Sequence, residues 1–170
     1  MENLVYFLRN GKNFLKIGEN KFLKPGEKYS SFRDSVLLEK DYNLIYKFFN
    51  RHGLYLEDLN ERNVETSEFR VEKIILEHIV HNFPSELFGL DNLKYLDLSG
   101  GAIKSIPKRI DKLKKLEELY LDECGLENIP YELGKLNNLR AISLMDNNIK
   151  SRGAGKIIGD LQSKGIEVLI

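Results

Sequence analysis

Apolar residues in the second half of the chain recur with a period of 23 residues. Three units align over residues 93–149, and each begins with apolar residues at its first, fourth and sixth positions. The aligned columns are Leu93, Leu116 and Leu139; Leu96, Leu119 and Ile142; and Leu98, Leu121 and Leu144. Because side chains two apart on a strand share a face, this opening segment predicts a short strand with one apolar face.

The period extends backward in a weaker form. Residues 71–92 carry the same pattern but are one residue short before the proline, as expected for a first repeat. Pro84, Pro107 and Pro130 keep the 23-residue spacing, and the apolar columns around them predict a turn or short helix that closes each unit. One unit alone cannot bury its apolar face, so stacking predicts a continuous core beside parallel strands.

Residues 93–98, Leu-Lys-Tyr-Leu-Asp-Leu, and residues 103–107, Ile-Lys-Ser-Ile-Pro, resemble the leucine-rich repeat family. The match is to its intracellular type, written LxxLxLxxNxLxxIPxxIxxLxx, over three or four units and about 100 residues. The resemblance implies an α/β fold, namely a short solenoid with a parallel β-sheet on its concave side. It implies a scaffold rather than a particular function.

The two ends differ from the repeats. Residues 150–163 predict a helix and residues 166–170 a last strand, which together would close the solenoid. Residues 5–8, 13–17 and 21–23 predict a three-stranded β-meander whose first turn is Asn10-Gly11. Residues 34–52 predict a helix that ends before Gly53, and residues 57–67 a hinge or loop.

We therefore divide the chain into residues 1–65, the meander and helix, and residues 66–170, the repeats with their C-terminal helix and strand. The first part is expected to cap the open edge of the first repeat. The alternative is that it forms a separate module that binds something itself.

Composition narrows the class of protein. The chain has 26 Lys and Arg against 26 Asp and Glu, so it has no global field for nucleic acid or an anionic membrane. It has one cysteine, no basic leader and no long apolar run. These features predict a soluble, cytoplasmic protein that binds neither nucleic acid nor membrane.

No constellation of residues predicts catalysis, a metal or a cofactor. His78 and His81 have no nearby cysteine or carboxylate pair at ligand spacing, and His52 is isolated. The segment 153–156, Gly-Ala-Gly-Lys, lacks the earlier glycine and the following Ser or Thr of a phosphate loop. Cys124 takes the Asn position of the repeat, which predicts a buried structural thiol rather than a nucleophile. We therefore expect a protein that is not an enzyme.

The remaining candidate is a surface. The residues between the strand leucines point away from the core, and they define the concave face. One column is Lys73, Tyr95, Glu118 and Ala141; the next is Ile75, Asp97, Tyr120 and Ser143; the third is Glu77, Ser99, Asp122 and Met145. All of these except Ala141 are the predicted partner-binding residues.

The predicted function is binding of a protein partner, and the acidic residues favour a partner with a basic surface. Bases collect instead on the convex side, at Lys104, Lys108, Arg109, Lys112, Lys114 and Lys115. Two alternatives stay open. Residues 1–65 could be the active module, regulating a nucleotide-binding or signalling enzyme, or the chain could be a structural protein that self-associates as a homo-oligomer.

Overall fold

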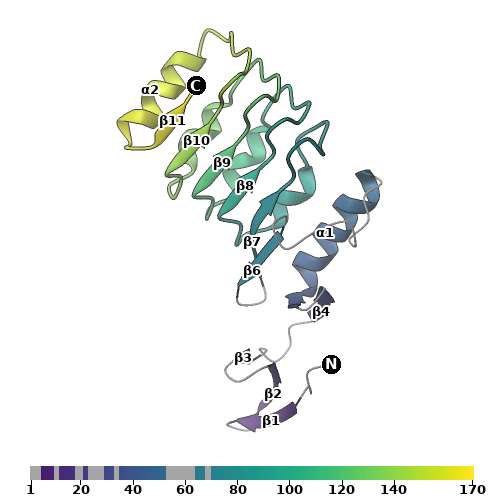
Figure 1. Cartoon of the computed structure of the whole chain (residues 1–170). Helices are drawn as coiled ribbons and strands as arrows, with labels where there is room; N and C mark the ends of the chain where they lie inside the picture. Colours follow the sequence, from purple (N-terminus) through teal and green to yellow (C-terminus); the bar gives the residue numbers. More distant parts are fainter. Residues whose placement is uncertain are drawn as a thin grey trace.

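A six-stranded sheet forms the body of the molecule (Figure 1). The computed structural model describes the backbone of residues 5–9, 12–17, 21–22, 29–32, 35–52, 64–67 and 70–170, and the side chains of residues 40–51, 64–67 and 70–170. The strands are β6 (Val64–Ser67), β7 (Arg70–Ile75), β8 (Tyr95–Asp97), β9 (Glu118–Tyr120), β10 (Ala141–Ser143) and β11 (Glu167–Leu169). Their order is β11-β10-β9-β8-β7-β6, and β7 to β11 run parallel.

The register of the sheet confirms the predicted repeat. Ile74 pairs with Leu96, Leu96 with Leu119, and Leu119 with Ile142. The first step is 22 residues and the next two are 23, so the missing residue of the first repeat is real. The apolar columns are buried, with Leu93, Leu96, Leu98, Leu116, Leu119 and Leu121 all fully buried.

Each repeat is closed by a 3₁₀ helix on the side of the sheet away from the concave face (Figure 1). These helices are η2 (Ser85–Gly89), η3 (Lys108–Lys112) and η4 (Tyr131–Lys135). Pro84, Pro107 and Pro130 occupy their N-cap positions. A proline fits there because its fixed φ suits the start of a helix, whose first N–H groups have no intrahelical partner.

The C-terminal end follows the prediction except at the helix start. Helix α2 (Ala154–Ser163) begins four residues later than residue 150, and the Ala154 N–H is bonded to the Ser151 carbonyl at 3.0 Å. Leu161 is fully buried. Gly165, at φ 79°, turns the chain into β11, which extends the parallel sheet as expected.

The N-terminal meander is confirmed. Strands β1 (Val5–Arg9), β2 (Lys12–Ile17) and β3 (Lys21–Phe22) form an antiparallel sheet in that order. The predicted turn at Asn10-Gly11 lies outside the described residues, as does Gly53.

The predicted helix at residues 34–52 was wrong at its start. Helix α1 (Glu39–His52) begins five residues later, after a hairpin of β4 (Tyr29–Phe32) and β5 (Ser35–Leu38) that the sequence analysis missed. Val36 and Leu37 pair with Ser31 and Ser30. The segment's apolar run is compatible with either period, and the backbone bonds of the hairpin decide for a strand.

The predicted loop at residues 57–67 was wrong in its last four residues. These form β6, antiparallel to β7 with an irregularity between Glu65 and Thr66. Residues 57–63 lie outside the described residues. Strand β6 has residues on both sides of the division at 65 and 66, and that division stays a prediction.

Helix α1 packs its apolar stripe on the first repeat. Ile45, Phe48 and Phe49 are buried and belong to the same core cluster as Leu87 of η2. A β-carbon at Gly89 would lie 2.6 Å from Leu44, so the absence of a side chain there makes room for the helix.

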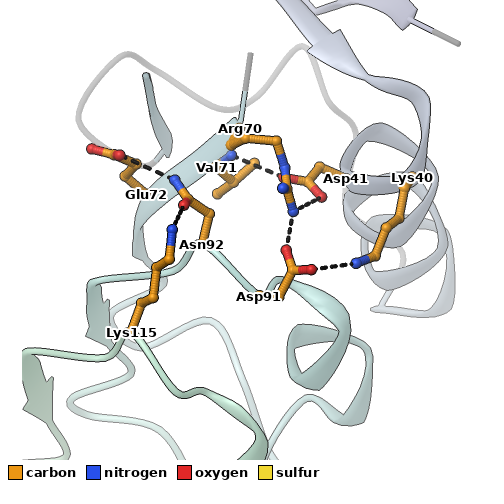
Figure 2. A network of polar contacts seen from close by, with 8 residues as sticks. All are labelled: Lys40, Asp41, Arg70, Val71, Glu72, Asp91, Asn92 and Lys115. Atoms are coloured by element: carbon orange, nitrogen blue, oxygen red, sulfur yellow. Dashed lines mark hydrogen bonds and ion pairs between the residues drawn. The ribbon is translucent and has the colours of Figure 1, made fainter. Parts of the chain in front are cut away.

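A polar network also joins α1 to the first repeat (Figure 2). Asp41, which is fully buried, accepts bonds from the Arg70 guanidinium and, at 3.0 Å, from the Val71 N–H. Arg70 also pairs with Asp91, which accepts a further bond from Lys40 at 2.9 Å. Glu72, Asn92 and Lys115 continue the network along the repeats. Two carboxylates therefore share the Arg70 guanidinium between α1 and the first repeat.

Candidate functional site

The strand register brings the predicted columns of the concave face together. Lys73 pairs with Tyr95, Tyr95 with Glu118, and Glu118 with Ala141. The second column is likewise Ile75, Asp97, Tyr120 and Ser143. The residues of the third column, Glu77, Ser99, Asp122 and Met145, follow the strands at the same edge.

The cap strand adds two residues that the sequence analysis missed. Glu167 pairs with Ala141 and Leu169 with Ser143, so both extend the concave face. Both are exposed. Their spacing from the preceding strand is 26 residues, and a search at period 23 therefore passes over them.

Two tyrosines form the centre of this face. The ring centroids of Tyr95 and Tyr120 lie 5.2 Å apart with planes tilted by 32°. Both side chains are partly exposed. The Lys73 ammonium lies 5.0 Å from the centroid of the Tyr95 ring and 2.6 Å from Glu65. The Tyr95 ring is therefore in a cation–π contact with Lys73 of the neighbouring strand β7.

Negative surroundings disfavour ionisation of both phenols. Burial, followed by the charges of Asp97, Glu118 and Glu77 and by Tyr120, raises the pKa of Tyr95 to about 12. The Tyr120 hydroxyl donates to Glu118 at 2.9 Å, and this bond is the largest cause that raises the pKa of Tyr120. Both tyrosines are neutral hydrogen-bonding groups at physiological pH.

Not every predicted contact residue is available to a partner. Asp97 is 7% exposed and accepts the Ser99 N–H at 2.9 Å, and Ser143 is 2% exposed. Asp122 accepts the Ser143 hydroxyl at 2.5 Å and the Met145 N–H at 2.8 Å. These polar groups hold the ends of the strands in place. By contrast, three glutamates of the face have no cationic partner among the described side chains, namely Glu77, Glu118 and Glu167.

The Asn position of the repeat is structural, as predicted. Asn147 accepts the Cys124 and Leu126 N–H groups at 3.2 and 2.8 Å and donates to the Leu121 and Leu144 carbonyls. One repeat earlier, the buried Cys124 thiol donates to the Leu98 carbonyl at 3.3 Å, and burial is the largest cause that raises its pKa. Gly101 fills the same position in the repeat before that, where a β-carbon would lie 2.7 Å from the Val80 carbonyl oxygen.

Other surfaces offer less specific chemistry. The six bases predicted for the convex side are all exposed. His78 and His81 are exposed as well, and the described residues contain no cluster of three metal-ligating side chains. Among the described helices, none has the length and apolar character needed to cross a membrane.

Comparison with known proteins agrees with this geometry. Residues 115–136 match the model of the Leucine Rich Repeat family. A leucine-rich repeat protein of Leptospira interrogans is similar in structure, with a TM-score of 0.54 and 28% identity over 61% of this chain and 26% of that one. No curated protein is similar enough in sequence to count as a relative.

Two further solved structures are similar at lower scores. An internalin from Listeria monocytogenes has a TM-score of 0.48 and 20% identity over 62% of this chain and 38% of that one. The leucine-rich repeat ectodomain of a receptor kinase from Arabidopsis thaliana has a TM-score of 0.48 and 15% identity, over 78% and 92% of the two chains.

The 23-residue register, the buried leucine columns and the match over residues 115–136 together define the class: this chain has the fold of leucine-rich repeat proteins. It spans about a quarter of the length of the Leptospira protein. Proteins of this fold generally bind other proteins, and they typically act as scaffolds without catalytic activity.

Proposed function

We propose that the chain is a non-enzymatic scaffold that binds a protein partner through its concave face. The Tyr95 and Tyr120 pair is the observation that carries the proposal. Tyrosine contributes a large contact area at low entropic cost and is enriched at the centres of protein interfaces. The two rings lie side by side on adjacent parallel strands, so they present one rigid surface.

The charges of the face favour a basic partner. Glu77, Glu118 and Glu167 surround the tyrosine pair, and Lys73 is the one base on the described strand positions of the face. Carboxylates arranged in this way speed association with a cationic surface and oppose binding of an acidic one. The single cysteine cannot form an intramolecular disulfide, which fits a reducing, cytoplasmic setting for this assembly.

The size of the face sets a requirement on the complex. Five parallel strands about 4.8 Å apart, each contributing about five residues of about 3.3 Å, cover on the order of 400 Å². A standard interface buries roughly 800 Å² on each partner. A stable partner must therefore also contact the loops after the strands, where Met145 is 43% exposed and Glu123 and Asp146 are exposed.

The test is capture of partners from the native host with the wild-type chain and with a Tyr95→Ala, Tyr120→Ala double variant. A Tyr131→Ala variant is the matched control, because Tyr131 is 60% exposed on the far side of the repeats. We expect the double variant to lose a partner that the wild type and the control both retain. Retention of every partner by a folded double variant would contradict the proposal.

A further inference from the structure

We propose that the concave face binds a lysine or arginine side chain of its protein partner over Ala141, between the carboxylates of Glu118 and Glu167 and beside the ring of Tyr120. This inference rests on the proposed function and names the chemical group that the face recognises. The occupant is a basic side chain of a protein, carried on a segment that lies across β9, β10 and β11.

The register creates the space. Ala141 pairs with Glu118 on one side and Glu167 on the other, so all three side chains leave the same face of the sheet. The two glutamates lie on strands that are two positions apart, or about 9.6 Å at the backbone. Between them alanine provides only a methyl group, and charge-assisted hydrogen bonds of about 2.8 Å on both sides of a cation fit within this width.

Tyr120 supplies an aromatic wall beside the same space. Its hydroxyl donates to one oxygen of Glu118 at 2.9 Å, which fixes the ring relative to that carboxylate. The negative charge of Glu167 also contributes to the raised pKa of Tyr120, which agrees with its position near the ring. A cation here meets two carboxylates and an aromatic edge or face.

The first repeat contains an internal example of this arrangement. Lys73 lies over the Tyr95 ring at 5.0 Å and contacts the Glu65 carboxylate at 2.6 Å. The fold itself therefore places a lysine ammonium between a carboxylate and a tyrosine on this sheet. Because Lys73 already fills the Tyr95 end and repels a second cation, the partner's basic side chain is directed to the Tyr120 end.

Two glutamates next to the concave columns differ from Glu118 and Glu167, because each is paired with a cation of the chain. Glu72 pairs with Lys94 at 2.9 Å and Glu117 with Arg140 at 3.2 Å. Glu118 and Glu167, which share the concave face, have no cationic partner among the described side chains. Glu118 and Glu167 are therefore open to an external cation, whereas Glu65, Glu72 and Glu117 are each paired with a cation of the chain itself.

The experiment is a titration of the isotope-labelled full chain, followed by amide chemical shifts at low salt, about 50 mM, where screening is weak. The probe is an acetylated and amidated peptide, Gly-Ser-Arg-Gly-Ser. Its control is the same peptide with citrulline, which keeps the shape of arginine without the charge. We expect shifts at Glu118, Tyr120, Ala141 and Glu167 with the arginine peptide and none with the citrulline peptide.

Four variants locate the binding. Glu118→Gln with Glu167→Gln should weaken the arginine peptide about tenfold, and Glu167→Gln alone, at the sheet edge, should weaken it less. Glu127→Gln, an exposed glutamate off the concave face, should leave it unchanged. Lys73→Gln should tighten it about twofold and add shifts at Tyr95, because a competing charge is gone.

Absence of shifts on the face, or equal affinity of the double glutamine variant and the Glu127→Gln control, would overturn the inference. Either result would leave the proposed function standing, because that proposal is tested separately with the tyrosine variants and the native partner. Binding of the citrulline peptide at the same residues would also overturn it, since recognition would then not depend on the cation.

Discussion

The Asp41 carboxylate accepts two bonds from the Arg70 guanidinium, at 3.0 Å from Nε and 3.2 Å from Nη2, across 29 residues of sequence. Asp41 is fully buried, whereas the Arg70 side chain is 25% exposed. Removal of the carboxylate leaves the partly buried Arg70 cation and the Val71 N–H without this partner. Loss of one member of a buried ion pair is strongly destabilising. We expect this contact to contribute more to the attachment of α1 than the exposed pair of Lys40 and Asp91 does.

Asp41→Ala should therefore lower the free energy of unfolding by about 3 kcal/mol, near the lower end for such pairs because Asp91 still contacts Arg70. Lys40→Ala is the matched control from the same network and helix. Its pair with Asp91 is about half exposed, so the expected loss is under about 1 kcal/mol. Urea unfolding of both variants checks the difference, and equal losses would contradict the assignment.

A second prediction concerns Asn147, whose side chain bonds to backbone groups of two repeats. Asn147→Ala should cost about 2 kcal/mol, because buried N–H and carbonyl groups lose their partners. Asn148→Ala, an exposed neighbour, should stay within about 0.5 kcal/mol of the wild type. Thermal unfolding of the two variants measures this difference in stability. A similar midpoint for both would count against a structural role of the Asn147 side-chain bonds.

Close approach of two repeats at Gly101 gives a third prediction. Alanine there would place its β-carbon 2.7 Å from the Val80 carbonyl oxygen, which belongs to the backbone and cannot rotate away. We expect Gly101→Ala to destabilise the fold by about 2 kcal/mol. Gly153→Ala has open space and a φ of −88°, so it should be neutral or slightly stabilising. Equal effects in denaturant unfolding would exclude the packing explanation.

Alkaline titration tests the electrostatics of the concave face. The pKa of Tyr95 is about 12 in the folded chain and about 10 when unfolded, so its neutral phenol stabilises the fold fully below pH 10. That contribution is lost as the pH rises from about 10 to about 12. Tyr95→Phe should remove the latest part of the tyrosinate absorbance change and make stability less dependent on pH in this window. If Tyr95→Phe instead removed the part of the absorbance change near pH 10, the raised pKa of Tyr95 would be contradicted.

The repeat could be predicted from sequence because its physics is local and periodic. Leu96, Leu119 and Ile142 recur at one spacing, and the same spacing fixes which residues share the concave face. The β4 and β5 hairpin could not be predicted, because residues 29–38 contain neither Gly nor Pro to mark a turn. The contact between Asp41 and Arg70 depends on how α1 docks, and no periodicity reports that.

In the candidate site, too, the periodic features could be predicted from sequence and the contacts between side chains could not. The columns followed from register, but the burial of Asp97 and Ser143 depends on which side chains and backbone groups surround them. Glu167 and Leu169 were missed because the cap strand departs from the 23-residue spacing. Sequence therefore predicted the face, and the structure showed which of its residues are exposed.

Site-specific photo-crosslinking tests the central claim most directly. A benzophenone amino acid would replace Tyr95 or Tyr120 on the concave face, or Tyr131 on the far side, in the full chain with its captured partner. Tyr95 and Tyr120 are partly exposed and Tyr131 is 60% exposed, so a partner can reach a crosslinking group at each of the three positions. We predict covalent adducts with the partner at positions 95 and 120 and none at 131. Adducts at 131 alone would contradict binding through the concave face.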